Sequence, residues 1–379
     1  MGNRVLILGG RGRIGSQVAA DIASHTEAQI TVTGRHPDDL STDTLAGRLT
    51  YQCLDLADQA ALTAAIQALG NQSNPSNNVV VHCAGPFHYR DTRVLDACIA
   101  AGVNYVDVSD HPSYTRKAIA CKAAATAAGI TAIVNTGIFP GISNSMVRRD
   151  VEQLDRADTI HLSYVVAGSG GAGLTVMRTT FLGLQHSFQA WIDGEWQTIQ
   201  PYSEREPIDF PAPYGRTGVY WFDMPETFTL PQTFPVKTVV TKFGTVPDFY
   251  NALTRWVAHG WHPWLLRQKP VIEFLSHVSH FMTDVTDRFS GIGVAIRSEV
   301  TGEKDGRPTQ VISTLVHPNT AIAAGCGTGS IVQLLLSGQL HRPGVWVVEQ
   351  VLTTSDFETS LQQRGIPLEQ QVLPAEQPG

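Results

Sequence analysis

The sequence has few charged residues. Of its 379 residues only 16% are Asp, Glu, Lys or Arg, against about 25% in a typical soluble protein. The 27 basic residues are outnumbered by 34 acidic ones, and a net charge of -7 gives no support to nucleic-acid binding. Apolar residues make up 42% of the chain, which is enough for a large core and excludes a mainly disordered protein.

Long hydrophobic runs and paired cysteines are also missing. The closest candidate for a membrane span, residues 256–266, is short and interrupted by His259, Gly260, His262 and Pro263. The five cysteines form no CxxC motif, and most lie in apolar patterns typical of buried, reduced thiols. The start of the chain does not resemble a secretory signal. We expect a soluble cytoplasmic protein, with peripheral membrane contact left open.

The first 135 residues alternate between two patterns. Short apolar runs typical of buried strands alternate with Ala-rich segments of helical periodicity. The expected strands are residues 4–8, 29–33, 49–54, 79–84, 104–108 and 130–135. Strands joined by helical crossovers predict an α/β fold, a Rossmann-type doubly wound parallel sheet.

The pattern changes after about residue 136. A helix at 140–154, a strand at 159–167, a helix from residue 270 and a hairpin within 291–316 predict a second domain of the α+β class. Seven prolines between residues 201 and 235 predict a long lid or arm. We expect a nucleotide-binding domain at 1–136, a substrate-binding or dimerisation domain at 137–320, and a C-terminal segment at 321–379.

The segment Gly10-Arg11-Gly12-Arg13-Ile14-Gly15 directly follows the first expected strand and opens a helix. In this context Gly10 permits a tight turn, Gly12 lets the backbone approach a pyrophosphate, and Gly15 lets helix and strand pack closely. The helix N-terminus also presents unpaired N–H groups to phosphates. We predict that all six residues bind a dinucleotide, the alternative being a glycine turn without a ligand.

The end of the second strand indicates which dinucleotide. It reads Thr33-Gly34-Arg35, with no acidic residue at the position where NAD-binding proteins hold the ribose. Arg35 can instead pair with a 2'-phosphate, while Arg11 can flank the adenine. The sequence therefore favours NADP, bound at Gly34 and Arg35 as well as at the glycine-rich turn. Alternatively, Arg35 is a solvated side chain that pairs with Asp38 or Asp39.

Later strand ends complete a recognisable pattern. Cys83-Ala84-Gly85-Pro86-Phe87 follows the fourth strand, and Pro140-Gly141, with Asn144 shortly after, follows the sixth. With the glycine motif, Gly34-Arg35, residues 94–107 and residues 344–349, the chain resembles the saccharopine dehydrogenase-like family. The resemblance implies NADP-linked hydride transfer in a cleft between a Rossmann domain and a smaller α/β domain, with residues 321–379 returning to the Rossmann side. Many members that act on amino acids have an acidic residue where this chain has Phe139, which argues against a charged amine substrate.

Several polar residues are candidates for the chemistry. Asp107 and Asp110 follow the fifth strand, where they can orient a substrate or relay a proton. Asp110 precedes His111-Pro112 and can equally be the N-cap of a helix. His88 is a candidate acid just beyond the cofactor-contacting segment Ala84, Gly85 and Pro86.

The expected substrate-binding residues are Tyr89, Phe139, Ser143 and Asn144, the last two being equally plausible as helix caps. A stripe of four residues has the spacing of metal ligands or of a solvated helix face, and we expect no metal there. The stripe consists of Glu273, His277, His280 and Asp284. Six of the seven tryptophans lie between residues 191 and 264, which indicates core, a pocket or an interface.

Taken together, these features predict an NADP-dependent oxidoreductase that transfers a hydride to or from a C–N or imine bond of a small metabolite. An enoyl (C=C) reductase for a bulky hydrophobic substrate is the first alternative, supported by Phe139 and the tryptophans. An NADP-sensing protein without turnover is the second. We expect the protein to be a homodimer with a small-molecule substrate.

Overall fold

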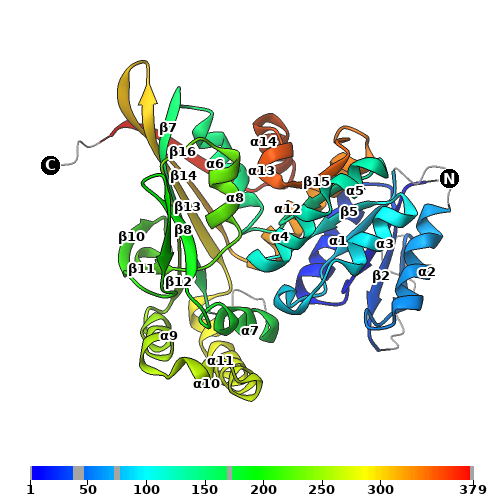
Figure 1. Ribbon diagram of the computed structural model, residues 1–379, viewed down its shortest axis with the longest axis horizontal. Coiled ribbons are helices and arrows are strands. Elements are labelled where there is room, and N and C mark those ends of the chain that lie inside the picture. Colours follow the sequence, from blue (N-terminus) through cyan, green and yellow to red (C-terminus); the bar gives the residue numbers. More distant parts are fainter. Residues whose placement is uncertain (1, 37–46, 72–76, 169–172, 376–379) are drawn as a thin grey trace. The chain divides into compact units, whose positions relative to one another are not determined.

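The chain folds into two compact units (Figure 1). The computed structural model describes residues 2–36, 47–71, 77–168 and 173–375. Unit 1 comprises Met1–Ile142 and Ala321–Leu352, and unit 2 comprises Ser143–Thr320 and Thr353–Gly379. The C-terminal residues, expected together on the Rossmann side, are therefore shared between the two units.

Unit 1 contains a seven-stranded, fully parallel sheet in the order β15-β6-β5-β4-β1-β2-β3. This is the predicted doubly wound architecture. Its elements are β1 (Arg4–Leu8), α1 (Arg13–His25), β2 (Gln29–Gly34), β3 (Leu49–Cys53), α2 (Gln59–Gly70), β4 (Val79–His82), the 3₁₀ helix η2 (Phe87–Tyr89), α3 (Arg93–Ala101), β5 (Asn104–Asp107), α4 (Pro112–Ala120), α5 (Lys122–Ala127), β6 (Thr131–Val134), α12 (Thr320–Leu336), β15 (Gly344–Val347) and α13 (Val348–Val351).

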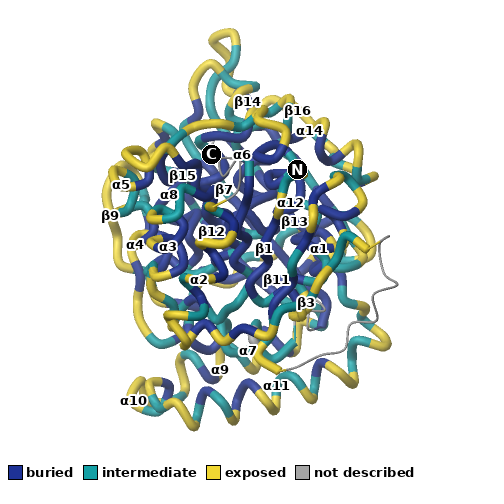
Figure 2. The backbone as a smooth tube through the Cα atoms, turned by 90° about the vertical axis from the view of Figure 1, so that its right-hand side faces the viewer, coloured by how far each residue is buried: buried dark blue, intermediate teal, exposed yellow. Residues whose placement is uncertain are grey.

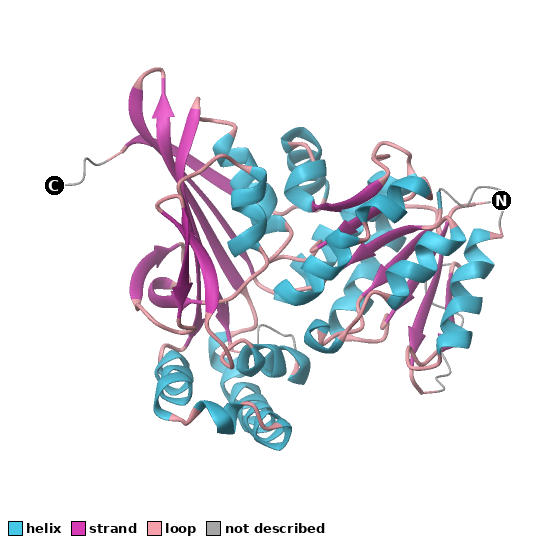
Figure 3. Ribbon diagram, viewed as in Figure 1, coloured by secondary structure: helices cyan, strands magenta, loops and turns pink. Residues whose placement is uncertain are grey.

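Helices bury both faces of this sheet (Figure 3). One face packs its apolar side chains on α2, α3, α4 and α5 in a single core cluster. Strands buried on both sides need nearly continuous apolar sequence, which is why β1 and β4 read as unbroken runs. Figure 2 shows the central strand β1 as a buried segment.

Helix α12 packs very closely on the N-terminal elements of unit 1. A Cβ at Gly325 would lie 2.7 Å from the Cβ of Gln17 in α1, and one at Gly327 would lie 2.5 Å from the carbonyl oxygen of Gly137. The Thr328 hydroxyl group donates to the carbonyl oxygen of Thr136 at 3.1 Å. These glycines thus allow α12, which begins more than 300 residues after α1, to pack against α1 and the turn after β6.

Unit 2 is built on a mixed seven-stranded sheet in the order β10-β11-β12-β7-β13-β14-β16, with a separate hairpin β8-β9. Strands β7 and β12 pair in parallel and the other neighbours are antiparallel. Its elements are α6 (Ile142–Val151), β7 (Arg156–Ala167), α7 (Leu174–Leu182), β8 (Phe188–Ile192), β9 (Glu195–Ile199), β10 (Glu206–Phe210), β11 (Gly215–Trp221), α8 (Glu226–Thr233), β12 (Thr238–Val246), α9 (Phe249–Gly260), α10 (Pro263–Leu266), α11 (Lys269–Ser290), β13 (Val294–Lys304), β14 (Arg307–His317), α14 (Thr354–Gln363) and β16 (Leu368–Pro374).

The expected lid at residues 201–235 is wrong. The segment forms β10, β11 and the helix α8. Its prolines lie at turns, on the edge strand β10, at the N-cap of α8 or inside α8 near its end. Edge strands and turns tolerate proline because no ladder hydrogen bond is lost there. The many prolines of this segment therefore indicate frequent turns rather than an irregular lid or arm.

Asp150 is a buried carboxyl group between α6 and the sheet of unit 2. Its Oδ1 accepts hydrogen bonds from Ser313 Oγ at 2.5 Å and from Gln370 Nε2 at 2.8 Å. Burial raises the pKa of Asp150 from 3.8 to about 6 despite hydrogen bonds from Ser298, Ser313 and Gln370. A folded pKa above the unfolded one means that the ionised group destabilises the fold.

We therefore expect Asp150→Asn to stabilise the protein most at neutral pH. Wild-type stability should fall as pH rises from about 4 to about 6, by up to about 3 kcal/mol, and the uncharged amide should remove this loss. Thermal unfolding at pH 4.5 and 7.5 measures the difference. The exposed carboxylate of Asp209, on the same sheet, gives the control variant Asp209→Asn, which should change little. An equal effect of Asp150→Asn at both pH values would contradict the assignment.

Candidate functional site

The glycine-rich turn connects β1 to α1 as predicted, with one change in the role of its glycines. The left-handed residue is Gly9, at φ 75°, rather than Gly10. Gly10 instead packs on the second strand, since a Cβ there would lie 2.7 Å from that of Val32. A Cβ at Gly15 would lie 2.4 Å from the Gly9 carbonyl oxygen, so Gly15 sets the close approach of helix and turn.

Gly12 leaves the start of α1 open to a ligand. It is the N-cap residue, it has no side chain to cap the helix, and a Cβ there would meet only the Gly9 carbonyl oxygen within 4 Å. The first N–H groups of a helix have no partner within it, and they carry the positive end of the helix dipole. This open backbone fits a pyrophosphate.

A cavity of about 210 Å³ lies in unit 1 beside the ends of β2, β3 and β4. Three of its lining side chains are arginines: Arg35 directly after β2, and Arg90 and Arg93 after β4. The full lining consists of Arg35, Asp55, Leu56, Ala57, His82, Tyr89, Arg90, Asp91, Arg93 and Val94. Arginines gathered around a small cavity fit a phosphate group.

Arg90 also fixes the segment that the sequence assigns to the cofactor. Its Nε donates to the Ala84 carbonyl oxygen at 2.7 Å and its guanidinium donates to that of Gly85 at 3.3 Å. Burial lowers the pKa of Arg90, and the positive charges of Arg35 and Arg93 lower it further. Mutual repulsion of this kind is relieved by an anion.

Arg35 itself is exposed at the end of β2. A Cβ at Gly34 would lie 2.8 Å from the Tyr51 hydroxyl oxygen and 3.2 Å from Arg11 Cγ, so glycine allows both side chains to lie across the strand end. Arg11 thus lies beside the end of β2. Asp38 and Asp39, the alternative partners of Arg35, lie outside the described residues.

A chain of buried polar groups lies beneath the ends of β4 and β5. His82 Nδ1 lies 3.1 Å from the Tyr105 hydroxyl oxygen, which lies 2.6 Å from that of Tyr114 in α4. Burial, followed by the charge of Arg90, lowers the pKa of His82 to about 3. His82 is therefore a neutral structural residue at physiological pH.

Asp107 belongs to a second buried network. Its Oδ1 accepts from the backbone N–H and Oγ of Ser109, at 3.0 and 2.6 Å, and from the backbone N–H of Asn135 at 3.0 Å. Burial raises the pKa of Asp107, and these hydrogen bonds oppose the rise. With no exposed surface, its carboxyl group joins the turns after β5 and β6 and does not face solvent.

His88 forms a contact that the sequence did not indicate. Its Nδ1 lies 3.0 Å from His111 Nε2, and the two rings meet edge to face with centroids 4.6 Å apart. His111 Nδ1 lies 2.8 Å from the Ser113 hydroxyl oxygen. Burial, followed by the charges of His88, Arg116 and Lys117, lowers the pKa of His111 to about 4. The two histidines and the serine form a continuous hydrogen-bonded line at the carboxyl ends of β4 and β5.

The helix cap expected at Asp110 is formed by the next residue. His111 is the N-cap of α4, and its Nδ1 accepts from the Ser113 backbone N–H at 3.3 Å. Pro112 then occupies the first turn, where its missing N–H costs nothing. The sequence signal of a cap before proline was sound, but its position was wrong by one residue.

In unit 2 the predicted substrate-binding residue Ser143 is hydrogen-bonded to the buried carboxyl group of Glu226. Ser143 Oγ donates to Glu226 Oε1 at 2.9 Å, and the Tyr164 hydroxyl group donates to the same oxygen at 2.9 Å. Ser143, Asn144 and Glu226 are all buried. Burial and the neighbouring Glu226 raise the pKa of Tyr164 well above its usual value, so its proton stays on the hydroxyl group. The sequence analysis did not single out Glu226, because nothing distinguishes it from the nearby Asp223 in the mixed stretch of residues 221–230.

Two predicted substrate residues lie in unit 1. Tyr89 is exposed at the cavity, with its ring edge to face on that of His88 at 4.9 Å between centroids. Phe139 is half-buried in the turn after β6.

The stripe on α11 is occupied by ion pairs. His280 Nδ1 lies 3.3 Å from Asp284, and Glu273 lies 2.6 Å from Arg178. Within the described residues, no group of three or more potential metal ligands is found.

Comparison with known proteins agrees with this geometry. Residues 5–133 match the family model described as the saccharopine dehydrogenase NADP-binding domain. Among solved structures, the saccharopine dehydrogenase (L-Glu forming) of Saccharomyces cerevisiae superposes with a TM-score of 0.69 at 15% identity, covering 98% of this chain and 100% of that one. An engineered D-amino acid dehydrogenase bound to NADP+ gives a TM-score of 0.49 at 16% identity, covering 96% and 99%. Among curated protein sequences, none matches significantly.

These matches confirm the coarse predictions. The family model confirms NADP as the cofactor and an NADP-dependent oxidoreductase as the class of protein. The yeast structure confirms the fold over both units.

Proposed function

We propose, because residues 5–133 match the family model described as the saccharopine dehydrogenase NADP-binding domain, that this NADP-dependent oxidoreductase transfers a hydride to or from a C–N or imine bond of a small metabolite. NADP supplies the hydride chemistry when bound, and the glycine-rich turn and the arginine-lined cavity provide its two phosphate sites. The remaining chemistry is the movement of one proton and the orientation of the substrate.

The observation that carries the proposal is the line His88–His111–Ser113. His111 accepts the Ser113 backbone N–H on Nδ1, so neutral His111 carries its proton on Nε2 and donates it to His88. When the pair takes up a proton, the proton binds His111 Nδ1 and the proton of His111 Nε2 passes to His88 Nδ1, so the direction reverses: charged His88 donates to His111 Nε2, and His111 Nδ1 donates to the Ser113 hydroxyl oxygen. The pair therefore takes up and releases one proton together.

The position of this pair suits proton transfer to a substrate. Ligands of doubly wound folds bind outside the carboxyl ends of the strands, and both histidines follow such ends, His88 after β4 and His111 after β5. His88 Nε2, which points away from the pair, is the atom that exchanges a proton with the substrate. Asp107 acts as a positioning residue, because its buried carboxyl group holds the two turns together.

Glu226 supports a C–N rather than a C=C substrate. The buried carboxyl group of Glu226, which accepts hydrogen bonds from Ser143 and Tyr164, gives unit 2 a hydrogen-bond acceptor. An acceptor of this kind favours a substrate with an N–H group over an enone, which has no donor to offer. Ser143 and Asn144, at the start of α6, orient this substrate.

An enoyl reductase for a bulky substrate is the second candidate function. Half-buried Phe139 and a group of exposed aromatic side chains on α9 to α11 favour it.

NADPH oxidation assays test the proposal. We expect turnover with imines formed from 2-oxo acids and primary amines, and none with α,β-unsaturated thioesters or enones. Glu226→Gln should raise KM for the imines more than for an uncharged substrate. Turnover of enones alone would transfer the assignment to the second candidate, and NADPH binding without any turnover would leave a sensor.

A further inference from the structure

Unit 2 exposes an unusual concentration of large apolar side chains. Among the described residues, fourteen large hydrophobic side chains are exposed, and nine of them lie between residues 249 and 289. We call these nine the outer helical face: Phe249, Leu253, Trp256, Trp264, Phe274, Val278, Phe281, Val285 and Phe289. Contiguous exposed patches on soluble proteins mark sites of interaction.

Helix α11 has two apolar sides, one buried against unit 2 and one exposed to solvent. Ile272 and Leu275 are buried, as expected for the side that packs on unit 2. Phe274, Val278, Phe281, Val285 and Phe289 recur every three or four residues and form a second stripe, whose last member is 88% exposed. The same spacing recurs on α9 at Phe249, Leu253 and Trp256. Ordinary packing of these helices on unit 2 does not need the second stripe.

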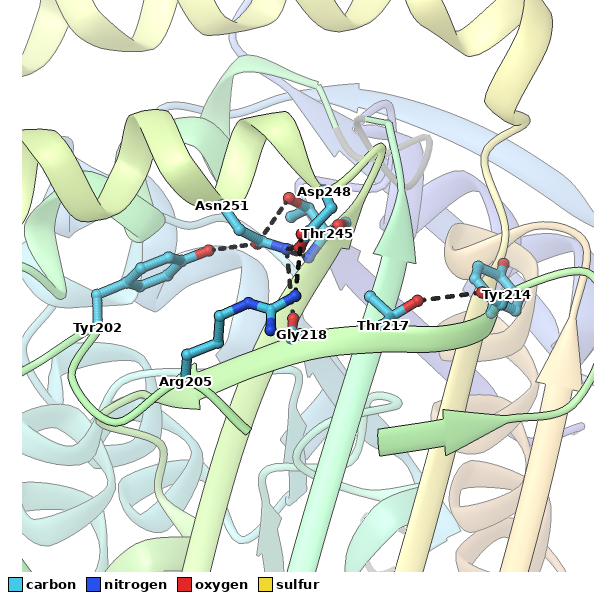
Figure 4. A network of polar contacts seen from close by, with 8 residues as sticks. All are labelled: Tyr202, Arg205, Tyr214, Thr217, Gly218, Thr245, Asp248 and Asn251. Carbon is cyan, nitrogen blue, oxygen red and sulfur yellow. Dashed lines mark hydrogen bonds and ion pairs between the residues drawn. The ribbon is translucent and has the colours of Figure 1, made fainter. Parts of the chain in front are cut away.

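The outer helical face is held rigidly in this exposed position. Asn251 at the start of α9 is fully buried, and its Oδ1 accepts from the Tyr202 hydroxyl group at 2.8 Å and from the backbone N–H of Thr245 at 2.9 Å (Figure 4). Its Nδ2 donates to the carbonyl oxygens of Thr245 and Gly218, at 3.0 and 3.3 Å. These hydrogen bonds, together with the buried Tyr250 and Val257, attach α9 to the rest of unit 2.

Further bonds attach α11. The hydroxyl oxygens of Tyr250 in α9 and Thr286 in α11 lie 2.8 Å apart, and Arg178 in α7 forms an ion pair with Glu273 at 2.6 Å. In Figure 2, α10 and α11 run along the edge of unit 2 with no other element beyond them. Among the described residues, the second stripe of α11 is thus exposed on unit 2.

The chemistry around the face favours a lipid surface. The exposed basic residues Arg255, Arg267 and Lys269 lie within five residues of Trp256 or Trp264 along the chain. Tryptophan and basic side chains at the edge of a Phe-rich surface are typical of helices that lie in the headgroup layer of a bilayer. No helix among the described residues has the length and apolar character to cross a membrane.

The charge of the segment that carries the outer helical face also favours an anionic lipid surface. Residues 249–290 contain four Arg and Lys against three Asp and Glu, whereas the whole chain has 27 against 34. Two of the three acidic groups, Glu273 and Asp284, are engaged by Arg178 and His280. The segment thus carries a formal charge of +1 within a chain of net charge -7, and each basic residue near an anionic surface adds about 1 kcal/mol.

We propose that the outer helical face docks on a phospholipid surface that carries anionic headgroups. The aromatic side chains enter the boundary of headgroups and acyl chains, and Arg255, Arg267 and Lys269 contact the lipid phosphates. The proposal does not depend on the reaction catalysed.

Sedimentation of the full-length protein with vesicles tests it. We expect the protein to bind vesicles of phosphatidylcholine with phosphatidylglycerol, to bind pure phosphatidylcholine about tenfold less, and to be released by high salt. Tryptophan fluorescence should shift to the blue on binding, because Trp256 and Trp264 leave water.

Matched variants distinguish vesicle binding through the outer helical face from nonspecific hydrophobic adsorption. Phe281→Ser with Phe289→Ser should weaken vesicle binding about tenfold or more. Val372→Ser with Leu373→Ser, which removes two exposed apolar side chains from β16, should leave vesicle binding unchanged. NADPH binding by all variants verifies folding.

Two results would overturn the proposal. One is a wild-type protein that stays in solution with anionic vesicles. The other is a wild-type dimer, seen by analytical ultracentrifugation without lipid, that Phe281→Ser with Phe289→Ser converts to a monomer. The second result would make the face an interface between copies of the chain.

Discussion

Replacing Arg35 with alanine should raise the dissociation constant for NADPH by about 10- to 100-fold and leave that for NADH nearly unchanged. Arg35 is exposed at the end of β2 and lines the cavity with Arg90 and Arg93. A 2'-phosphate of NADPH at this position would form charge-assisted hydrogen bonds with Arg35. NADH has a neutral ribose hydroxyl group there, which cannot form such bonds. Fluorescence titration with the two reduced nucleotides measures the change.

Two other arginines give the contrast that makes this result specific. Arg90→Ala should weaken both nucleotides, because Arg90 holds the carbonyl groups of Ala84 and Gly85 in the cofactor segment. Arg4→Ala, at the opposite end of β1, should weaken neither. An equal loss of NADPH and NADH binding in Arg35→Ala would show that Arg35 supports the fold of the site rather than recognising the phosphate.

Much of unit 1 could be predicted because its signals are local. Apolar runs bounded by turns placed six strands within two residues of their observed ends, and the glycine motif follows β1 as expected. The role of Gly9 was assigned to Gly10, since the left-handed turn and the packing on Val32 need two different glycines that are adjacent in sequence. Local patterns reveal that a tight turn exists more reliably than which residue adopts it.

The contacts that define the candidate site were not predictable in the same way. His88 and His111 are 23 residues apart, and Ser143 and Glu226 are 83 apart. No periodic sequence pattern links the two members of either pair, because the members are brought together by the order of strands in the sheet and by the position of α8. For the same reason β16, whose last four residues are all exposed, could not be recognised as the edge strand that pairs with β14.

The outer helical face shows a limit of a different kind. The apolar positions of α11 were recognised from their spacing, but periodicity alone cannot tell a side that is buried from one that is exposed. The low charge of the chain thus has two physical origins, a sheet buried on both faces in unit 1 and an exposed aromatic surface in unit 2.

His88→Gln should lower kcat about 100- to 1,000-fold with little change in NADPH affinity, since the proton donor is lost while the nucleotide sites remain. His111→Asn should lower kcat about tenfold. Asparagine is a good N-cap, so this variant preserves the start of α4 and removes only the contact with His88. Stopped-flow measurement of NADPH oxidation separates these effects from product release.

The pH profile distinguishes a proton relay from a merely structural pair. Because burial and the charges of His88, Arg116 and Lys117 hold the pKa of His111 near 4, His111 is neutral above that pH and can accept a hydrogen bond from charged His88. Removing this acceptor destabilises the charged form, so the alkaline limb of the kcat profile for imine reduction should move to lower pH in His111→Asn. A lower kcat with an unshifted profile would mean that His111 only orients the loop, and an unchanged kcat in His88→Gln would exclude His88 as the acid.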